Sequence, residues 1–338
     1  MSAPLVVVDA DVLGRERTGD ETYVENLLRA LPRIARGELR FVAVTRNPDL
    51  VPAGVEPLLL PARSQELRMA WALPRLLRRI RPALAHFQHV IAPRCPSPAV
   101  VTVHDLSFER DGRSMGAIDR IVFRVAVPRS ARRAEHILAV SERTKRDLVE
   151  LYDVAPEKIT VTPHGVDPHF TADGRPPGEY LLFVGAIQKR KHPLAASDAA
   201  VELGLPLVVA GPAKDAELAR ELARRGALLR GYVSKGELAE LYRGAACLVM
   251  PSRFEGFGLP LLEAMACGTP VVAGPDLALR EVGGDAVLYA RPPELADSIR
   301  RALAERERLA AAGIERAREF SWEETARRTL EVYRRVLA

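Results

Sequence analysis

Cysteine and aromatic residues are scarce in this chain of 338 residues. The three cysteines, Cys95, Cys247 and Cys267, are an odd number without a Cys-x-x-Cys pair, so neither a disulfide framework nor a zinc site is expected. Aromatic residues make up only 5% of the sequence and do not alternate with basic residues as they do on a nucleic-acid-binding surface. We therefore expect no nucleic-acid partner.

Long apolar runs are also missing. No run approaches the roughly 18 residues that a membrane-spanning helix needs, and Met1–Val8 leads into a strand-like segment instead of a signal peptide. The Gly-x-Gly-x-x-Gly turn of dinucleotide-binding proteins does not follow the first apolar run, which argues against a nicotinamide-dependent dehydrogenase. These absences favour a cytoplasmic protein.

The net charge of +5 belongs to the first half of the chain. Residues 1–166 carry 25 basic and 20 acidic residues, an excess of five, whereas residues 167–338 carry 24 of each. Solvated helix faces explain this excess most simply. The alternative is peripheral contact with an anionic membrane on its inner face, since basic clusters are attracted to acidic lipids. The basic side chains gather in two groups: Arg75, Arg78, Arg79 and Arg81, and Arg124, Arg129, Arg132 and Arg133.

Short apolar runs alternate with amphipathic stretches along the whole chain, which predicts an α/β fold. Continuous Val/Leu runs are typical of parallel strands covered by helices on both faces. The expected strands are Leu5–Val8, Phe41–Thr45, Ala83–Phe87, Val100–His104, Ile137–Ser141, Ile159–Pro163, Leu181–Gly185, Leu207–Gly211, Leu228–Tyr232, Cys247–Pro251, Val271–Ala273 and Val287–Tyr289.

The length favours two domains, because single domains usually run to about 100–200 residues. The Pro- and Gly-rich stretch Pro163–Pro177 has the composition of a linker. We expect one Rossmann-like, doubly wound domain over residues 1–166 and a second over residues 167–320.

The most informative segment is Met250–Ala273, in which a strand is expected to end in a glycine-bearing loop before a short helix. Pro260 suits the first turn of that helix. Gly256 and Gly258 allow a ligand to approach the backbone, and amides expected to be free around Gly258–Leu261 would favour an anion such as a diphosphate. Taken alone, a glutamate such as Glu263 near a helix start is most often a capping partner; Glu255 could accept hydrogen bonds from sugar hydroxyls.

Glu255 and Glu263, eight positions apart around Gly-Phe-Gly-Leu-Pro, resemble the donor-site signature of the family 4, group 1 retaining glycosyltransferases. The resemblance implies the GT-B fold, with two facing Rossmann-like domains, the second binding a nucleotide sugar. It also implies that Glu255 holds the transferred sugar, that Phe257–Leu259 hold the phosphates and that Glu263 holds the ribose. The last helix, Ser321–Leu337, would cross back to complete the first domain as residues 321–338.

Further segments extend this resemblance over nearly the whole chain. Phe183–His192 resembles the turn after Gly185 whose basic pair, here Arg190 and Lys191, neutralises the leaving diphosphate. Segment Arg230–Leu238 resembles the part that meets the nucleobase. His104 resembles the residue that faces the transferred sugar, although a lone histidine at a strand end is as often structural. The remaining donor-contact candidates are Gly19, Gly231, Tyr232, Val233, Ser252 and Gly256.

Three positions depart from the family pattern, and the first of them bears on the acceptor. In the first loop, Arg17–Tyr23, Asp20 and Glu21 replace the usual small residues. The acceptor, a sugar or a lipid-linked sugar, is therefore not identified by the motifs. His164 stands where the interdomain link more often has Asn. The turn at Gly185 lacks the arginine that directly follows it in some members, so the phosphate would be neutralised by Arg190 and Lys191.

The resemblance implies front-face transfer of a hexose, mannose or glucose, to an acceptor hydroxyl. Catalysis would rest on Glu255, Arg190, Lys191 and His104, with electrostatic stabilisation of the leaving diphosphate as the main contribution. No Asp-x-Asp motif stands in a suitable loop, so we expect neither a metal nor another cofactor. GDP-mannose is the preferred donor, by resemblance.

Other functions stay open at this point. A retaining glycosidase could use Glu255 and Glu263, but would need the two carboxyls about 5 Å apart. A nucleotide-sugar epimerase would turn over a donor without an acceptor. A non-catalytic nucleotide-sugar sensor would bind the donor without turnover.

Overall fold

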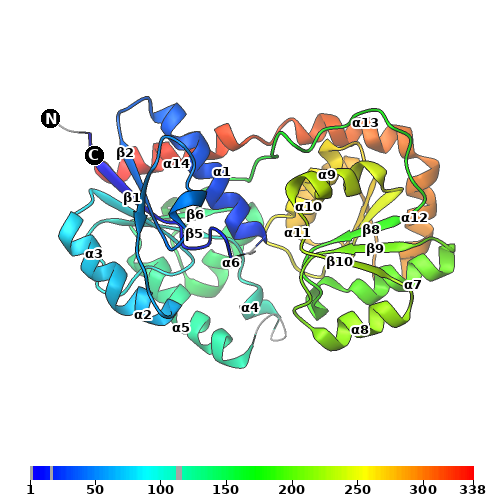
Figure 1. Cartoon of the computed structure of the whole chain (residues 1–338), viewed down its shortest axis with the longest axis horizontal. Coiled ribbons are helices and arrows are strands. Elements are labelled where there is room, and N and C mark those ends of the chain that lie inside the picture. The colour runs from blue at the N-terminus through cyan, green and yellow to red at the C-terminus, as the bar shows by residue number, and fades with distance from the viewer. Residues whose placement is uncertain (1–2, 16–17, 112–115) are drawn as a thin grey trace. The chain divides into compact units, whose positions relative to one another are not determined.

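A computed structural model describes residues 3–15, 18–111 and 116–338, which form two compact units (Figure 1). Unit 1 comprises Met1–Leu106, Ala117–Gly165 and Trp322–Ala338. Unit 2 comprises Ser107–Gly116 and Val166–Ser321. None of the described helices is both long enough and apolar enough to cross a membrane.

Unit 1 contains a seven-stranded sheet, parallel throughout, in the order β3-β2-β1-β4-β5-β6-β7. Its strands are β1 (Leu5–Asp9), β2 (Arg40–Thr45), β3 (Glu56–Leu59), β4 (Leu84–Gln88), β5 (Ala99–Val103), β6 (His136–Ala139) and β7 (Ile159–Val161). Its helices are α1 (Thr18–Ala35), α2 (Gln65–Leu67), a π-helical turn (Arg68–Ala72), α3 (Leu73–Ile80), α5 (Ala117–Arg133), α6 (Glu142–Tyr152) and α14 (Trp322–Leu337). The last helix is tied into this unit, because Thr325 donates to Pro163 O at 2.5 Å and Arg334 pairs with Glu38 at 2.8 Å.

Unit 2 contains a second parallel sheet of six strands in the order β10-β9-β8-β11-β12-β13. Its strands are β8 (Leu181–Val184), β9 (Leu207–Ala210), β10 (Leu228–Gly231), β11 (Cys247–Met250), β12 (Val271–Ala273) and β13 (Leu288–Tyr289). Its helices are α4 (Ser107–Arg110), α7 (Pro193–Leu203), α8 (Ala216–Arg224), α9 (Lys235–Gly244), α10 (Leu259–Ala266), α11 (Leu277–Gly283), α12 (Leu295–Ala304) and α13 (Arg306–Ala317).

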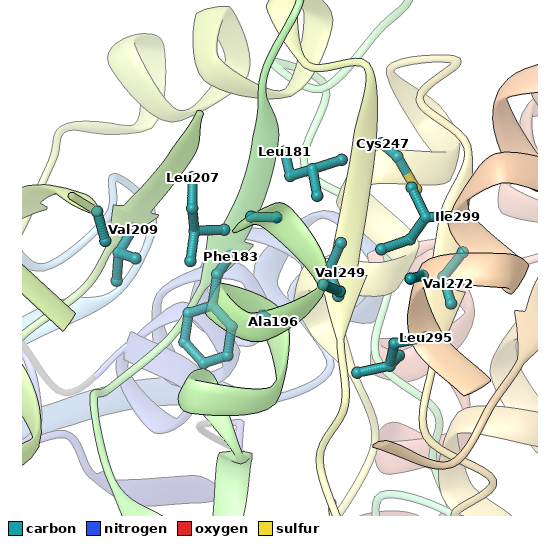
Figure 2. Close-up of a cluster of buried hydrophobic side chains, with 14 of the residues drawn as sticks. Leu181, Phe183, Ala196, Leu207, Val209, Cys247, Val249, Val272, Leu295 and Ile299 are labelled. Atoms are coloured by element: carbon teal, nitrogen blue, oxygen red, sulfur yellow. The ribbon is translucent and has the colours of Figure 1, made fainter. Parts of the chain in front are cut away.

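The central strands form because their apolar runs are buried on both faces. In unit 2, Phe183, Val249 and Val272 from neighbouring strands pack with Ala196 of α7 and Ile299 of α12 in one cluster (Figure 2). Such strands are typical of a parallel sheet that helices cover on both sides, because neither face of the sheet is then in contact with water.

Every strand expected from the sequence is present, with its ends within two residues of the expected positions. The exception to the sequence reasoning is β3, which was not expected. Its run Glu-Pro-Leu-Leu is short and contains Pro57, a residue that breaks the ladder in a central strand. β3 lies at the sheet edge, where a missing N–H is tolerated.

Two glycines bring the carboxyl ends of β8 and β9 together. Gly185 N donates to Ala210 O at 2.8 Å, and Gly211 follows β9 with a φ of 143°. A Cβ on Gly211 would lie 2.2 Å from Gly185 O, so only glycine fits there. The position of Gly185 therefore depends on Gly211.

We predict that Gly211→Ala lowers the free energy of unfolding by about 2–4 kcal/mol, because the methyl group displaces the Gly185 backbone. Urea unfolding measures the change. Gly204→Ala is the matched control, since Gly204 also has a positive φ of 65° but no atom within 4 Å of an added Cβ. Equal losses in both variants would contradict the steric explanation.

Candidate functional site

The loops after β8 and β11 begin at neighbouring positions on the carboxyl edge of the unit 2 sheet. The two strands are parallel neighbours, with Leu181 opposite Cys247. From β8 the chain continues to β9 on one side, and from β11 it continues to β12 on the other. Ligands of open α/β sheets bind at such a reversal of strand order.

Side chains from these two loops meet in a buried ion-pair cluster. Lys191 Nζ donates to Glu255 Oε1 at 2.9 Å, and the Arg190 guanidinium lies 3.3 Å from Glu255 Oε2. Arg190 also donates to Phe254 O. The three charged side chains are each about nine-tenths buried, with exposed fractions of 9%, 11% and 10% for Arg190, Lys191 and Glu255. The structure thus brings together three of the four residues expected to be catalytic.

The two cations of this cluster determine the charge state of Glu255. Burial alone would raise the pKa of Glu255, but the charges of Lys191 and Arg190 outweigh it and lower that pKa to about 2. Glu255 is therefore ionised at neutral pH. Within these three residues a guanidinium and an ammonium face one carboxylate, and these are the two cationic groups that bind phosphate in proteins.

Lys191 lies directly against Gly185. A Cβ at Gly185 would be 3.0 Å from Lys191 Nζ, and the φ of Gly185 is 134°. Any larger residue would push the lysine away from Glu255. Gly185 therefore contributes to the cluster by leaving room for the lysine stem.

Helix α10 begins at the end of the loop that follows β11 and carries Glu255. Its N-cap is Gly258, with a φ of 109°, and a Cβ there would lie 2.6 Å from Leu279 Cδ2. Among the described residues no side chain caps this helix start, so its dipole favours an anion there. Of the amides expected to be free around Gly258–Leu261, that of Leu261 is not, because it already donates to Gly258 O at 3.0 Å.

Glu263, inside α10, has a different environment from Glu255. Tyr242 OH donates to Glu263 Oε2 at 2.8 Å. Burial, followed by the charge of Asp167, raises the pKa of Glu263 to about 8, and the Tyr242 hydrogen bond and Lys235 lower it only in part. The carboxyl is therefore mostly protonated at neutral pH in the ligand-free protein.

The sequence reasoning missed Tyr242. It is a fully buried residue of α9, 21 positions before Glu263. A tyrosine on the apolar face of a helix looks like any other core residue, and nothing in the local pattern indicates a carboxylate partner.

The remaining expected donor residues of unit 2 lie along the same sheet edge. Gly231 ends the edge strand β10 and accepts from Gly211 N at 2.7 Å, while the Tyr232 side chain is 51% exposed. One strand separates β10 from β8, so Gly231–Val233 begin about 10 Å along the sheet from the Lys191 loop. Ser252 is buried in the loop after β11, and the Phe257 ring packs edge-on against Phe320.

His104 and Gly19 belong to unit 1. His104 follows β5 and is 8% exposed. Its Nε2 lies 2.9 Å from Gln88 Oε1, and its Nδ1 lies 3.9 Å from Asp20 Oδ1. Burial lowers the pKa of His104 to about 4, although Asp20 acts in the opposite direction, so the imidazole is neutral at pH 7. Arg17, part of the expected first loop, lies outside the described residues.

A buried polar chain supports His104 from the α14 side. Tyr333 OH lies 2.6 Å from His86 Nδ1, and His86 Nε2 lies 2.7 Å from Thr102 Oγ1. Thr102 Oγ1 is 2.9 Å from Tyr23 OH, and the Tyr23 ring packs edge-on against His104 at 4.9 Å. The C-terminal helix is thereby connected to the His104 environment.

Among the described residues, one group could hold a metal ion. Asp20, His89 and His104 each offer one ligand atom, and these atoms lie within 4.8 Å of one another. Two imidazoles and a carboxylate suit zinc or another transition metal.

In unit 1 the strand order reverses between β1 and β4, and arginine and aspartate side chains pair with one another at that point. Arg68, fully buried, lies 2.7 Å from Asp9 and 3.3 Å from Asp11, while Arg46 forms two hydrogen bonds to Asp11. Arg15 also lies 3.5 Å from Asp11 Oδ2, so three arginines pair with two aspartates here.

Comparisons with known proteins agree with this arrangement. The family described as "Glycosyl transferases group 1" matches residues 172–320, and "Glycosyltransferase Family 4" matches residues 17–170. The chain is 29% identical over 315 residues to the O-antigen chain mannosyltransferase B of Escherichia coli, covering 82% of this chain and 81% of that protein.

Two solved structures show the same fold. Sucrose-phosphate synthase from Thermosynechococcus elongatus superposes with a TM-score of 0.79 at 20% identity, covering 99% of both chains. Anabaena Alr3699/HepE in complex with UDP-glucose superposes with a TM-score of 0.75 at 15% identity, covering 97% of this chain and 98% of that one. With one family match over each Rossmann-like unit, the chain belongs to the family 4, group 1 glycosyltransferases and has the GT-B fold.

Proposed function

We propose that this protein is a retaining glycosyltransferase that moves a hexose from a nucleoside-diphosphate sugar to an acceptor hydroxyl of a sugar or lipid-linked sugar, in polysaccharide, glycolipid or glycoconjugate synthesis. The observation that carries the proposal is the buried cluster of Arg190, Lys191 and Glu255. It combines an arginine and a lysine with a carboxylate held in the ionised state, in the loops after β8 and β11, the second of which leads to the start of α10.

Each part of this site has a role in the proposed reaction. Arg190, Lys191 and the Gly258 end of α10 bind the diphosphate and stabilise its charge as it leaves. Glu255 accepts hydrogen bonds from the hydroxyls of the transferred sugar, and Glu263 accepts them from the ribose. Segment Gly231–Val233 meets the base, and His104 of unit 1 contacts the sugar.

In the proposed chemistry the acceptor oxygen bonds to the anomeric carbon on the face from which the phosphate oxygen leaves. The acceptor's proton passes to that phosphate oxygen, so the products are the glycoside and the nucleoside diphosphate. No divalent ion is required, because Arg190 and Lys191 supply the positive charge. GDP-mannose is the proposed donor, and the mannosyltransferase relative supports it.

A glycosidase fits this site less well. Its nucleophilic carboxylate must be open to the anomeric carbon, whereas Glu255 already pairs with two cations. A nucleotide-sugar epimerase or a non-catalytic nucleotide-sugar-binding protein would use the same donor contacts, and these alternatives differ from a transferase in acceptor-dependent product formation.

The first prediction about the proposed reaction concerns donor binding. One of UDP, GDP, ADP or dTDP should raise the thermal unfolding temperature by several degrees, since a ligand at about a hundred times its dissociation constant stabilises by about 2.7 kcal/mol. The rise should persist in EDTA and disappear in Glu263→Ala. Glu217→Ala, an exposed glutamate of α8, is the control and should keep it. If no nucleotide raises the unfolding temperature of the wild-type protein, the donor site is refuted.

The second prediction concerns pH. Because ribose hydroxyls donate best to a carboxylate, binding should release the proton that Glu263 holds below about pH 8. Nucleotide affinity should therefore rise on the order of a hundredfold between about pH 6 and about pH 9 in the wild type, since each pH unit below the pKa costs about a factor of ten. Isothermal titration calorimetry measures it, and Glu263→Gln should remove this part of the pH dependence.

The sign of the linked stability change is opposite. The folded, ligand-free protein holds a proton on Glu263 that the unfolded chain, at an ordinary pKa of 4.5, has lost. The Glu263 contribution to unfolding free energy should thus fall as pH rises from 4.5 to about 8 and then level off. Equal pH profiles of wild type and Glu263→Gln would contradict the assignment.

The third prediction concerns turnover. Lys191→Met should lower kcat on the order of a hundredfold, because it removes a charge that stabilises the leaving diphosphate. Release of nucleoside diphosphate from the identified donor measures it. Lys189→Met is the control, because Lys189 is a nearby exposed lysine whose replacement should change kcat little. A folded Lys191→Met variant with wild-type kcat would remove Lys191 from the mechanism.

A further inference from the structure

Helix α5 exposes a stripe of aliphatic side chains to solvent. Ile118, Ile121, Val122 and Val125 are 79%, 63%, 55% and 48% exposed. Their spacing of three, four and seven places them on one face of the helix. Side chains of this kind are usually buried, and a contiguous exposed group of them marks a surface that contacts something else. We call these four residues the α5 stripe.

The second half of α5 is fixed to the body of unit 1. Val127 and Ala131 are buried, and Ser130 Oγ accepts from Ile91 N at 3.0 Å. Arg133 donates to Cys95 O at 2.7 Å. The helix is therefore anchored at one end while its first turns present the stripe.

Charge distinguishes between the possible occupants of this surface. Helix α5 carries five arginines and one aspartate, a formal charge of +4 over 17 residues. Arg129 and Arg132 are exposed and continue the line of the stripe toward the C-terminal end of the helix. A second copy of the helix on this face would bring like charges together, whereas an anionic lipid surface attracts both the charge and the aliphatic side chains.

A second segment of unit 1 has the same character. Leu67 and Trp71, one helical turn apart, are 53% and 60% exposed. The Arg75 guanidinium lies 5.1 Å from the centre of the Trp71 ring. Tryptophan and arginine side chains are typical of the boundary between lipid headgroups and acyl chains. In the view of Figure 1, the labels of α2 and α5 both lie along the lower edge of unit 1.

We infer that the α5 stripe is a membrane-docking site, which inserts its aliphatic side chains into the headgroup boundary of an anionic bilayer while Arg129 and Arg132 contact the lipid phosphates. The inference goes beyond the proposed transfer reaction and does not depend on it. It would bring the enzyme to the surface at which a lipid-linked acceptor is found.

Vesicle co-sedimentation tests the site, using phosphatidylcholine vesicles with and without phosphatidylglycerol. The wild type should bind the phosphatidylglycerol vesicles, and the double variant I121S/V122S should bind them at least about tenfold more weakly. V201S is the matched control, since Val201 is 66% exposed on α7 of unit 2. Binding by R129Q/R132Q should depend less on phosphatidylglycerol and on salt.

Two measurements separate this proposal from others. The unfolding temperature and its rise with nucleotide should be unchanged in I121S/V122S, so a failure of docking does not count against the donor site. Wild-type protein that fails to bind either vesicle, or a double variant that binds as well as wild type, would overturn the inference.

A fluorescent label tests insertion directly. The native cysteines Cys95, Cys247 and Cys267 are buried, so an environment-sensitive probe can be attached selectively to Ile121→Cys or, as the control, to Val201→Cys. The emission of the probe at position 121 should shift to the blue on phosphatidylglycerol vesicles, and that at position 201 should not. Equal responses at both positions would contradict docking through α5.

Discussion

The buried pairing of Lys191 and Arg190 with Glu255 is the interaction on which the candidate site depends. Taking three charges out of water costs several kcal/mol, and a well-packed apolar cluster of the same volume would usually be at least as stable. Such a cluster is therefore poorly explained by stability alone. A role in binding explains the arrangement better, because an arginine and a lysine held side by side are suited to a phosphate group. The geometry follows from the sheet, because the two loops follow adjacent parallel strands. Gly185 leaves the space that Lys191 occupies, and Gly211 allows the Gly185 backbone to approach.

The two glutamates of the motif show how burial can give the same side chain opposite properties. Both are buried to the same degree, since each whole residue, backbone included, is 8% exposed. The pKa of Glu255 falls to about 2 because two cations outweigh the cost of burial, while that of Glu263 rises to about 8 because a tyrosine hydroxyl and a more distant lysine do not. One residue is thus a permanent anion and the other an acid that can lose its proton when hydroxyl donors arrive. The motif contains both glutamates but does not indicate that their pKa values differ. Their partners, from the β8 loop for Glu255 and from α9 for Glu263, determine the difference.

Local sequence predicted the features that depend on local sequence. The parallel sheets follow from apolar runs of four or five residues, and the start of α10 follows from Gly258 and Pro260. Features that depend on distant partners were missed. Tyr242 reaches Glu263 from another helix, and Gln88 reaches His104 from another strand. The amide of Leu261 was expected to be free because the sequence does not show that the first turn closes on Gly258 O. The α5 stripe was missed for a similar reason. Helix α5 has apolar residues on the buried side of its second half and also on the exposed side of its first half, so the sequence pattern does not distinguish the buried apolar residues from the exposed ones.

The distribution of charge between the halves of the chain bears on both proposals. The half that carries the anion-attracting cluster, residues 167–338, has no net charge, since a buried pair of cations next to one carboxylate attracts a phosphate without any overall excess. The excess of five positive charges in residues 1–166 is therefore not needed for the donor. At the strand-order reversal of unit 1, Arg15, Arg46 and Arg68 pair with Asp9 and Asp11, so this group contributes one positive charge to the excess. Helix α5 alone accounts for four of the five charges and carries them next to exposed aliphatic side chains. Attraction to an acidic membrane requires positive charge next to an apolar surface, and α5 has both. Solvation of a helix face would explain the charged side chains of α5 but not its exposed aliphatic stripe.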